Sequence, residues 1–246
     1  MRPQILFIPP WWWAIERQAA PEGTTGLTTR LMQDAEMKLF IWPTWKIGPS
    51  VEPNWRAVVE EIKNQMPPEC HVVDTGPGGA LSLLAVSDRK DVKSLILGGI
   101  TVPPATLRAV GKTNQAEGST IFFRTTRAHQ LVRLNFQGAS EEFISEVGTL
   151  MDAGLNWAFM AEFQRSLEGL NLVENRPQVE IPVLYVDPPL AAPGYAEMAE
   201  VLLEFVPHAR VEPVELYPSQ MQDPAAGIEF AEKALAFIDE VERSAA

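Results

Sequence analysis

The chain has 246 residues, of which 46% are apolar and 21% charged, a composition typical of globular proteins that excludes a disordered or fibrous chain. Lys and Arg number 20 against 32 Asp and Glu, and the net charge of −12 disfavours nucleic acid as a partner. No stretch approaches the roughly 20 apolar residues of a membrane span, and the first residues lack the pattern of a signal peptide. The single cysteine, Cys70, has no partner for a disulfide within the chain. We therefore expect a soluble, cytoplasmic protein that binds no membrane.

Short apolar runs alternate with helical patterns through the first hundred residues. The run Ile5 to Ile8 ends at Pro9 and Pro10, as a buried strand ending in a rigid loop does. Strands are expected at 5–8, 38–42, 70–73 and 92–97, and helices at 52–65 and 80–86. This alternation predicts an α/β fold with a mostly parallel central sheet and helices on both of its faces.

The alternation stops after residue 101 and resumes near residue 178. The intervening part contains two helical patterns, at 141–153 and 157–170, and no strong strand. Beyond it we expect strands at 181–186 and 210–216 and helices at 195–205 and 227–241. The prediction is one sheet domain formed by residues 1–101 and 178–246, with a helical lid, residues 102–177, inserted into it.

One segment resembles a known family. Residues 69–80 read ECHVVDTGPGGA, which is similar to the strand, nucleophile elbow and helix of the α/β-hydrolase fold family, where an apolar strand is followed by G-x-S-x-G-G-A. Residues 181–190 resemble the strand that delivers the family's catalytic acid, and residues 209–216 resemble the strand before its histidine loop. The resemblance covers nearly the whole chain and implies the α/β-hydrolase fold with a lid.

Two of the three catalytic residues of the family are missing from the matching positions of this chain. Its nucleophile falls on Gly76, and the next residue, Pro77, has no N–H to donate to an oxyanion. The loop that should hold the catalytic histidine, residues 216–224, has Ser219 and Gln220 and no histidine. Asp187 matches the position of the acid. The resemblance therefore implies a degenerate triad, a pseudo-hydrolase. The three histidines fall elsewhere, at His71, His129 and His208.

Three residues are candidates for acid or base chemistry: Asp74, Thr75 and Asp187. A second alignment, shifted by two residues, places Asp74 at the position of the aspartate nucleophile of the haloalkane dehalogenases. Residues 72–76 resemble the V-x-D-x-G-G pattern of those enzymes. The shift loses the match of Gly78 and Gly79 to the start of the helix. The alternative is a carboxylate that caps the turn and the start of the following helix.

Aromatic and basic residues suggest two binding sites. Trp11, Trp12 and Trp13 follow the first strand and Trp42 ends the second, so they are candidates to line a ligand pocket at the edge where open parallel sheets bind ligands. The alternative is a packing cluster. Arg124, Arg127 and Arg133 are candidates to bind an anion or an acidic partner protein, and the alternative is solvated surface charge. No metal or cofactor motif is found.

Two main functions stay open from the sequence. The first is non-hydrolytic action on a small, mostly apolar or aromatic molecule, such as a cyclisation, elimination, decarboxylation or isomerisation in specialised metabolism. The alternative is a catalytically inactive protein that binds a ligand or a partner. A minor alternative is an esterase or thioesterase. Whether the chain is an enzyme, and its oligomeric state, are not determined by these patterns.

Overall fold

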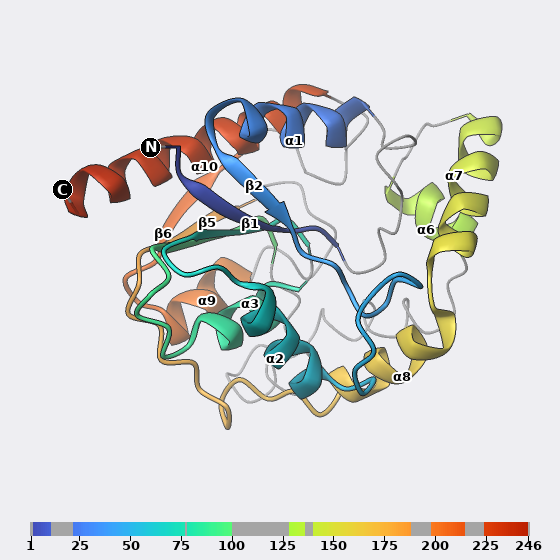
Figure 1. The fold of residues 1–246 in the computed structure, drawn as a ribbon, viewed down its shortest axis with the longest axis horizontal. Coiled ribbons are helices and arrows are strands. Elements are labelled where there is room, and N and C mark those ends of the chain that lie inside the picture. The colour runs from blue at the N-terminus through green and yellow to red at the C-terminus, as the bar shows by residue number, and fades with distance from the viewer. Residues whose placement is uncertain are drawn as a thin grey trace.

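The described part of the chain forms one parallel sheet. The structure, a computed structural model, describes residues 2–10, 22–76, 78–99, 128–135, 140–187, 198–214 and 224–245. Six strands pair in the order β2-β1-β3-β4-β5-β6, and every pair is parallel (Figure 1). The strands are β1 (Gln4–Ile8), β2 (Glu36–Leu39), β3 (His71–Asp74), β4 (Ser94–Leu97), β5 (Val183–Asp187) and β6 (Arg210–Pro213).

Helices cover both faces of this sheet. Figure 1 shows α1 (Glu22–Asp34) and α10 (Pro224–Ala245) above the sheet, and α2 (Trp55–Gln65), α3 (Gly79–Val86) and α9 (Met198–Phe205) below it. The apolar core is divided in the same way, since one cluster of buried side chains joins the strands to α1 and α10 and the other joins them to α2, α3 and α9. The predicted fold class, a mostly parallel α/β sheet with helices on both faces, is confirmed.

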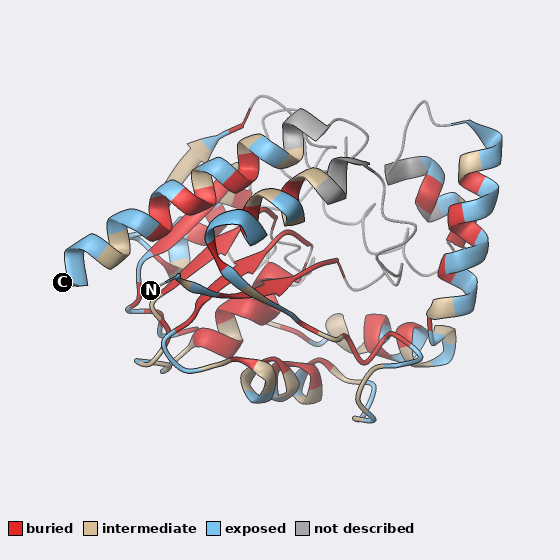
Figure 2. Ribbon diagram, turned by 45° about the horizontal axis from the view of Figure 1, so that its top comes forward, coloured by how far each residue is buried: buried red, intermediate tan, exposed pale blue. Residues whose placement is uncertain are grey.

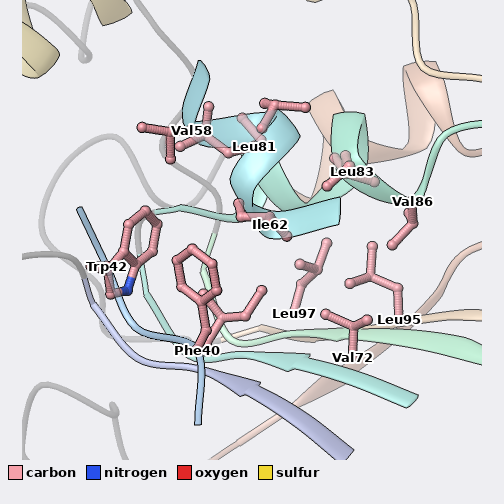
Figure 3. Close-up of a cluster of buried hydrophobic side chains, with 14 of the residues drawn as sticks. Phe40, Trp42, Val58, Ile62, Val72, Leu81, Leu83, Val86, Leu95 and Leu97 are labelled. Atoms are coloured by element: carbon pink, nitrogen blue, oxygen red, sulfur yellow. The ribbon is translucent and has the colours of Figure 1, made fainter. Parts of the chain in front are cut away.

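The inner strands are buried on both faces, which explains their nearly continuous apolar sequences. Every residue of β3 and β4 is buried, and the inner strands are red in Figure 2. In Figure 3, Val72, Leu95 and Leu97 of the sheet lie against Ile62 of α2 and the side chains of α3. The two layers of helices therefore exclude water from the whole centre of the sheet.

Helix α2 shows how the local sequence sets a boundary. The side chain of Asn54 accepts a hydrogen bond of 2.9 Å from the Ala57 N–H, so the helix begins at Trp55 rather than at residue 52 as predicted. Its buried side chains recur at helical spacing and form the face that packs on the sheet: Trp55, Val58, Val59 and Ile62.

Three helices lie between β4 and β5 in the chain: α6 (Ala128–Asn135), α7 (Glu141–Gly154) and α8 (Trp157–Leu167). The junction of α7 and α8 is bonded to the loop after β2, because the Asn156 N–H donates to the Thr44 carbonyl at 2.8 Å and the Lys46 N–H donates to the Gly154 carbonyl at 2.8 Å. Buried side chains of all three helices belong to the same core cluster as α2 and α3. The assignment of residues 102–177 as an inserted helical lid stays a prediction.

Helices α1 and α6 are not among the expected elements, and the ends of several strands and helices differ from their expected positions. Helix α1 was not predicted, because its thirteen residues include four threonines and two glycines, which are weak helix formers. It forms where Leu27 and Leu31 join the core cluster shared with α10. Strand β2 ends at Leu39 rather than Trp42, and Trp42 enters the core instead. No described helix is long and apolar enough to span a membrane.

A polar cluster joins α10 to the amino ends of β3 and β4. The fully buried His71 ring lies 2.8 Å from the Ser94 hydroxyl through Nδ1 and 3.0 Å from Glu242 through Nε2. Because a carboxylate only accepts, Nε2–H donates to Glu242 and Nδ1 accepts from Ser94. The Lys93 ammonium binds the same carboxylate at 2.6 Å. Burial lowers the pKa of His71, and the cluster lies at the opposite end of β3 from Gly76.

Candidate functional site

The carboxyl ends of the central strands bring four residues into one row. Asp74 of β3 is in register with Ile8 of β1 on one side and Leu97 of β4 on the other, and Leu97 is in register with Tyr185 of β5. Two residues further along each chain segment come Pro10, Gly76, Gly99 and Asp187, which we call the row, and among them Gly76 lies close to both Pro10 and Gly99. Ligands of open parallel sheets bind at this edge. The row is therefore the candidate site.

Gly76 lies in the turn between β3 and α3 and is closely covered by the loop after β1. A β-carbon built on Gly76 would be 2.8 Å from the Pro10 α-carbon and 3.0 Å from its nitrogen, closer than real β-carbons approach backbone atoms. Gly76 is also buried. The position that the resemblance assigns to the nucleophile therefore has no space for a side chain unless Pro10 moves.

Gly99, in the next position of the row, is close to Gly76. Its β-carbon would lie 3.4 Å from the Gly76 carbonyl oxygen. Two residues without side chains thus separate Pro10 from Asp187 along the row.

Asp74 ends β3 and is fully buried. Its Oδ1 accepts a hydrogen bond of 2.8 Å from the Gly76 N–H, and its Oδ2 accepts one from the Ser82 hydroxyl of α3. Burial raises the pKa of the Asp74 carboxyl to about 7, although both hydrogen bonds oppose the shift. These bonds connect the β3–α3 turn to the start of α3. They fit the alternative given in the sequence analysis, a carboxylate that caps the turn and the start of the following helix. A catalytic Asp74 stays a prediction.

The Trp42 ring packs in the core next to Asp74. It has no exposed surface, its Nε1–H donates to the Pro9 carbonyl at 2.6 Å, and it meets Phe40 edge to face at 4.9 Å between ring centroids. A β-carbon on Gly78 would touch both the Trp42 ring, at 3.2 Å, and Asp74 Oδ2, at 3.4 Å. Figure 3 shows Trp42 and Phe40 side by side near α2. The structure places Trp42 within the core, and a ligand contact by it stays a prediction.

Thr75 follows Asp74 and is 6% exposed. Its N–H donates to the Ile8 carbonyl at 3.1 Å, which extends the pairing of β1 and β3. Its buried hydroxyl has no hydrogen-bond partner among the described residues. Thr75 is therefore held in place by its backbone, and no described group activates its hydroxyl.

Asp187 ends β5 and is only partly buried. Its Oδ1 is shielded from solvent and has no hydrogen-bond partner in the described part of the chain. Burial raises the pKa of this carboxyl. Side chains two residues apart in a strand lie on the same face of the sheet, so Asp187 projects from the same face as Tyr185. Tyr185 belongs to the core cluster that also contains side chains of α6, α7 and α8.

Of the other predicted site residues, the structure describes only Arg133. Arg133 of α6 is exposed and forms a double hydrogen bond with Glu141 of α7, so its charge is already paired within the chain. Within the described segments no group of His, Cys, Asp or Glu side chains could hold a metal ion. The remaining predictions fall outside the described residues: Trp11, Trp12, Trp13, Pro77, Arg124, Arg127, Ser219 and Gln220.

Three residues that shape the site were not predicted. The sequence indicates Pro10 only as the end of a strand and gives no role to Gly99 or Ser82. A serine at the fourth position of an otherwise apolar eight-residue helix was a signal for Ser82, since a buried hydroxyl needs a polar partner. The approach of Pro10 to Gly76 has no local signal, because it joins segments 66 positions apart in the chain.

Comparison with solved structures identifies the fold. A hydrolase from Oleispira antarctica matches with a TM-score of 0.72 and 11% identity over 97% of this chain and 92% of that one. An esterase from Exiguobacterium antarcticum matches with a TM-score of 0.71 and 14% identity over 97% and 93%. A haloalkane dehalogenase loop variant from Bradyrhizobium elkanii matches with a TM-score of 0.65 and 15% identity over 100% and 92%. The chain has the α/β-hydrolase fold. No protein-family model and no curated protein sequence matches it.

Gly76→Ala tests the close packing at the turn. The added methyl group meets the Pro10 backbone, so we expect a loss of roughly 1–3 kcal/mol in the free energy of unfolding. Denaturant titration followed by circular dichroism measures it. The control is Gly169→Ala, where the nearest atom to the new β-carbon is the Ser166 carbonyl oxygen at an ordinary 3.5 Å. Equal stabilities of the two variants would show that Pro10 does not restrict the turn.

Asp74→Asn tests the buried carboxyl. The pKa of Asp74 is about 7 in the folded protein and an ordinary 3.8 in the unfolded chain, so the folded state binds the proton more tightly. The contribution of this proton to the stability of the fold is complete below about pH 4 and is lost as the pH rises through 7. Between pH 4 and pH 8, we therefore expect the free energy of unfolding of the wild type to fall relative to that of the variant by on the order of 2–4 kcal/mol.

This change is measured from the unfolding free energies at both pH values. The proteins compared are the wild type, Asp74→Asn and the exposed control Asp152→Asn. His71 changes stability in the opposite direction, since its lowered pKa costs stability as the pH falls below 6.5, but it is common to all three proteins. A pH dependence of Asp74→Asn parallel to that of the wild type would contradict a buried, proton-binding Asp74.

Proposed function

We propose that this α/β-hydrolase-fold protein acts without a serine nucleophile on a small, mostly apolar organic molecule bound at the carboxyl edge of the sheet, with Asp187 as its acid or base. The observation that carries the proposal is the Asp187 carboxyl, whose Oδ1 is shielded and has no partner among the described residues. A carboxyl in such surroundings has a raised pKa and takes up a proton more readily than an exposed one. Cyclisation, elimination, decarboxylation and isomerisation all need such a group.

Hydrolysis is the activity that the similar structures favour, since they include a hydrolase and an esterase. Two features of this chain argue against a serine mechanism. The turn between β3 and α3 carries Gly76 against Pro10, and Pro77 lacks the N–H that the resemblance assigns to the oxyanion hole. Loss of one oxyanion donor alone costs about 10²- to 10³-fold in rate, so both changes together fit a protein that no longer hydrolyses esters.

A binding protein without chemistry is the second candidate. It is favoured by the complete burial of Asp74, both of whose oxygens are already bonded within the chain. Under this alternative the site would recognise a ligand by shape and apolar contact, and Asp187 would serve only to orient it. The two candidates differ in whether Asp187 moves a proton.

Base-catalysed opening of a nitrobenzisoxazole distinguishes them. In this reaction a carboxylate removes the ring C–H proton, the N–O bond breaks, and a coloured cyanophenolate forms, with no nucleophile or oxyanion hole involved. We expect wild-type protein to accelerate the reaction and Asp187→Asn to lose at least about 100-fold of that acceleration. The rate should rise with pH through the raised pKa of Asp187, because only the ionised carboxyl is a base.

The matched control is Asp152→Asn, which changes an exposed carboxyl of α7 and should leave the rate unchanged. Circular dichroism of both variants shows whether they remain folded. An acceleration equal in wild type and Asp187→Asn, or no acceleration by folded wild type, would contradict an acid-base role for Asp187 and favour the binding protein.

A further inference from the structure

Strand β2 forms an open edge of the sheet. It is the first strand in the order β2-β1-β3-β4-β5-β6, and it pairs only with β1 among the described residues. Glu36, Lys38 and Leu39 are exposed, and Figure 2 shows this strand in the colours of exposed and intermediate residues where the inner strands are red. An edge strand presents unpaired N–H and C=O groups to which another strand can bond.

The hydrogen bonds of β2 show which groups face outward. The Glu36 N–H donates to the Pro3 carbonyl and the Phe40 N–H donates to the Phe7 carbonyl. The backbone N–H and C=O groups of the even-numbered residues therefore point toward β1. Met37 and Leu39 therefore direct their N–H and C=O outward. At Ile41, the next outward position, the Gln65 side chain accepts from the N–H at 2.9 Å and donates to the carbonyl at 3.0 Å. Gln65 thus closes the edge and leaves open only the part before it.

Charge alternates along the open part. Glu36 and Lys38 are two residues apart and project from the same face, that of α2, where the Lys38 ammonium lies 2.6 Å from the Gln65 carbonyl oxygen. The side chain of Leu39 projects from the opposite face and is 40% exposed. The edge therefore presents one negative and one positive side chain on one face and an apolar side chain on the other.

We propose that β2 pairs with β2 of a second copy of this chain, antiparallel and centred on Met37. A two-fold axis at Met37 places each Glu36 opposite Lys38 of the other copy, which makes two favourable cross-strand charge pairs. An axis at Lys38 would oppose the two Lys38 ammonium groups. An axis at Leu39 would oppose Met37 to Ile41, whose N–H and carbonyl are both bonded to Gln65. The axis at Met37 opposes Leu39 to Ala35, of which the N–H is bonded to the Leu31 carbonyl, so the Leu39 N–H can still donate to the Ala35 carbonyl. The sheet then continues through the dimer, independently of the function proposed for the carboxyl edge.

Charge reversal tests both the dimer and its register. Glu36→Lys gives an edge with two positive side chains, and Lys38→Glu gives one with two negative side chains, so each variant turns both pairs from attractive to repulsive. We expect each variant alone to dimerise roughly tenfold more weakly than the wild type. An equal mixture of the two variants, and the double variant Glu36→Lys/Lys38→Glu, should recover the wild-type affinity.

Sedimentation velocity over a concentration series measures the fraction with the mass of two 27.3 kDa chains. Circular dichroism controls for folding, and Asp152→Lys, which changes the net charge by the same two units as Glu36→Lys at an exposed position of α7, controls for net charge. Recovery in the mixture supports the register centred on Met37. Wild type that stays monomeric throughout, single variants that dimerise as the wild type does, or a mixture without recovery would each overturn the proposal.

Discussion

The approach of Pro10 to Gly76 is the contact on which the candidate site depends. Strands β1 and β3 are neighbours in register, so the residues that follow them meet at the carboxyl edge of the sheet. Because the Pro10 backbone lies where a β-carbon of residue 76 would be, the turn between β3 and α3 accommodates only glycine. A proline on one side and a glycine on the other let the two segments approach this closely. The same contact removes the position from which a side chain could attack a substrate.

The buried carboxyl of Asp74 supports this turn from below. It connects the Gly76 N–H to the Ser82 hydroxyl, and so fixes the backbone of the turn to the body of α3. Gly78 allows Trp42 and Asp74 to meet beneath the start of that helix. An ionised carboxylate in this apolar place is costly, which is why its pKa is raised to about 7. Both oxygens of Asp74 are thus bonded within the turn and the helix, and the Asp187 carboxyl is more exposed than that of Asp74.

Much of this arrangement could be predicted from local patterns. The apolar run before Asp74 and the glycines after it predicted a strand, a turn and a helix, and the structure has β3 and α3 there. The fold class followed from the alternation of such units. Helix α1 could not be predicted in this way, because its threonines and glycines disfavour a helix, whereas the contacts of Leu27 and Leu31 with the core arise only in the folded chain. Ser82 lies only eight residues after Asp74, but the packing of Trp42 against Gly78 joins segments 36 positions apart and has no local signal.

The proposed absence of a serine nucleophile has one direct test: reaction of the purified protein with a fluorophosphonate, which phosphonylates activated serines, followed by measurement of the intact mass of the chain. A hydrolase with an active triad gains one adduct per chain, whereas a turn that carries Gly76 against Pro10 offers no serine hydroxyl at that position. We expect the mass to be unchanged after prolonged incubation, while an active serine esterase treated in parallel is fully labelled. One stoichiometric adduct on a serine of this chain would contradict a mechanism without a nucleophile and would place the protein among the serine hydrolases.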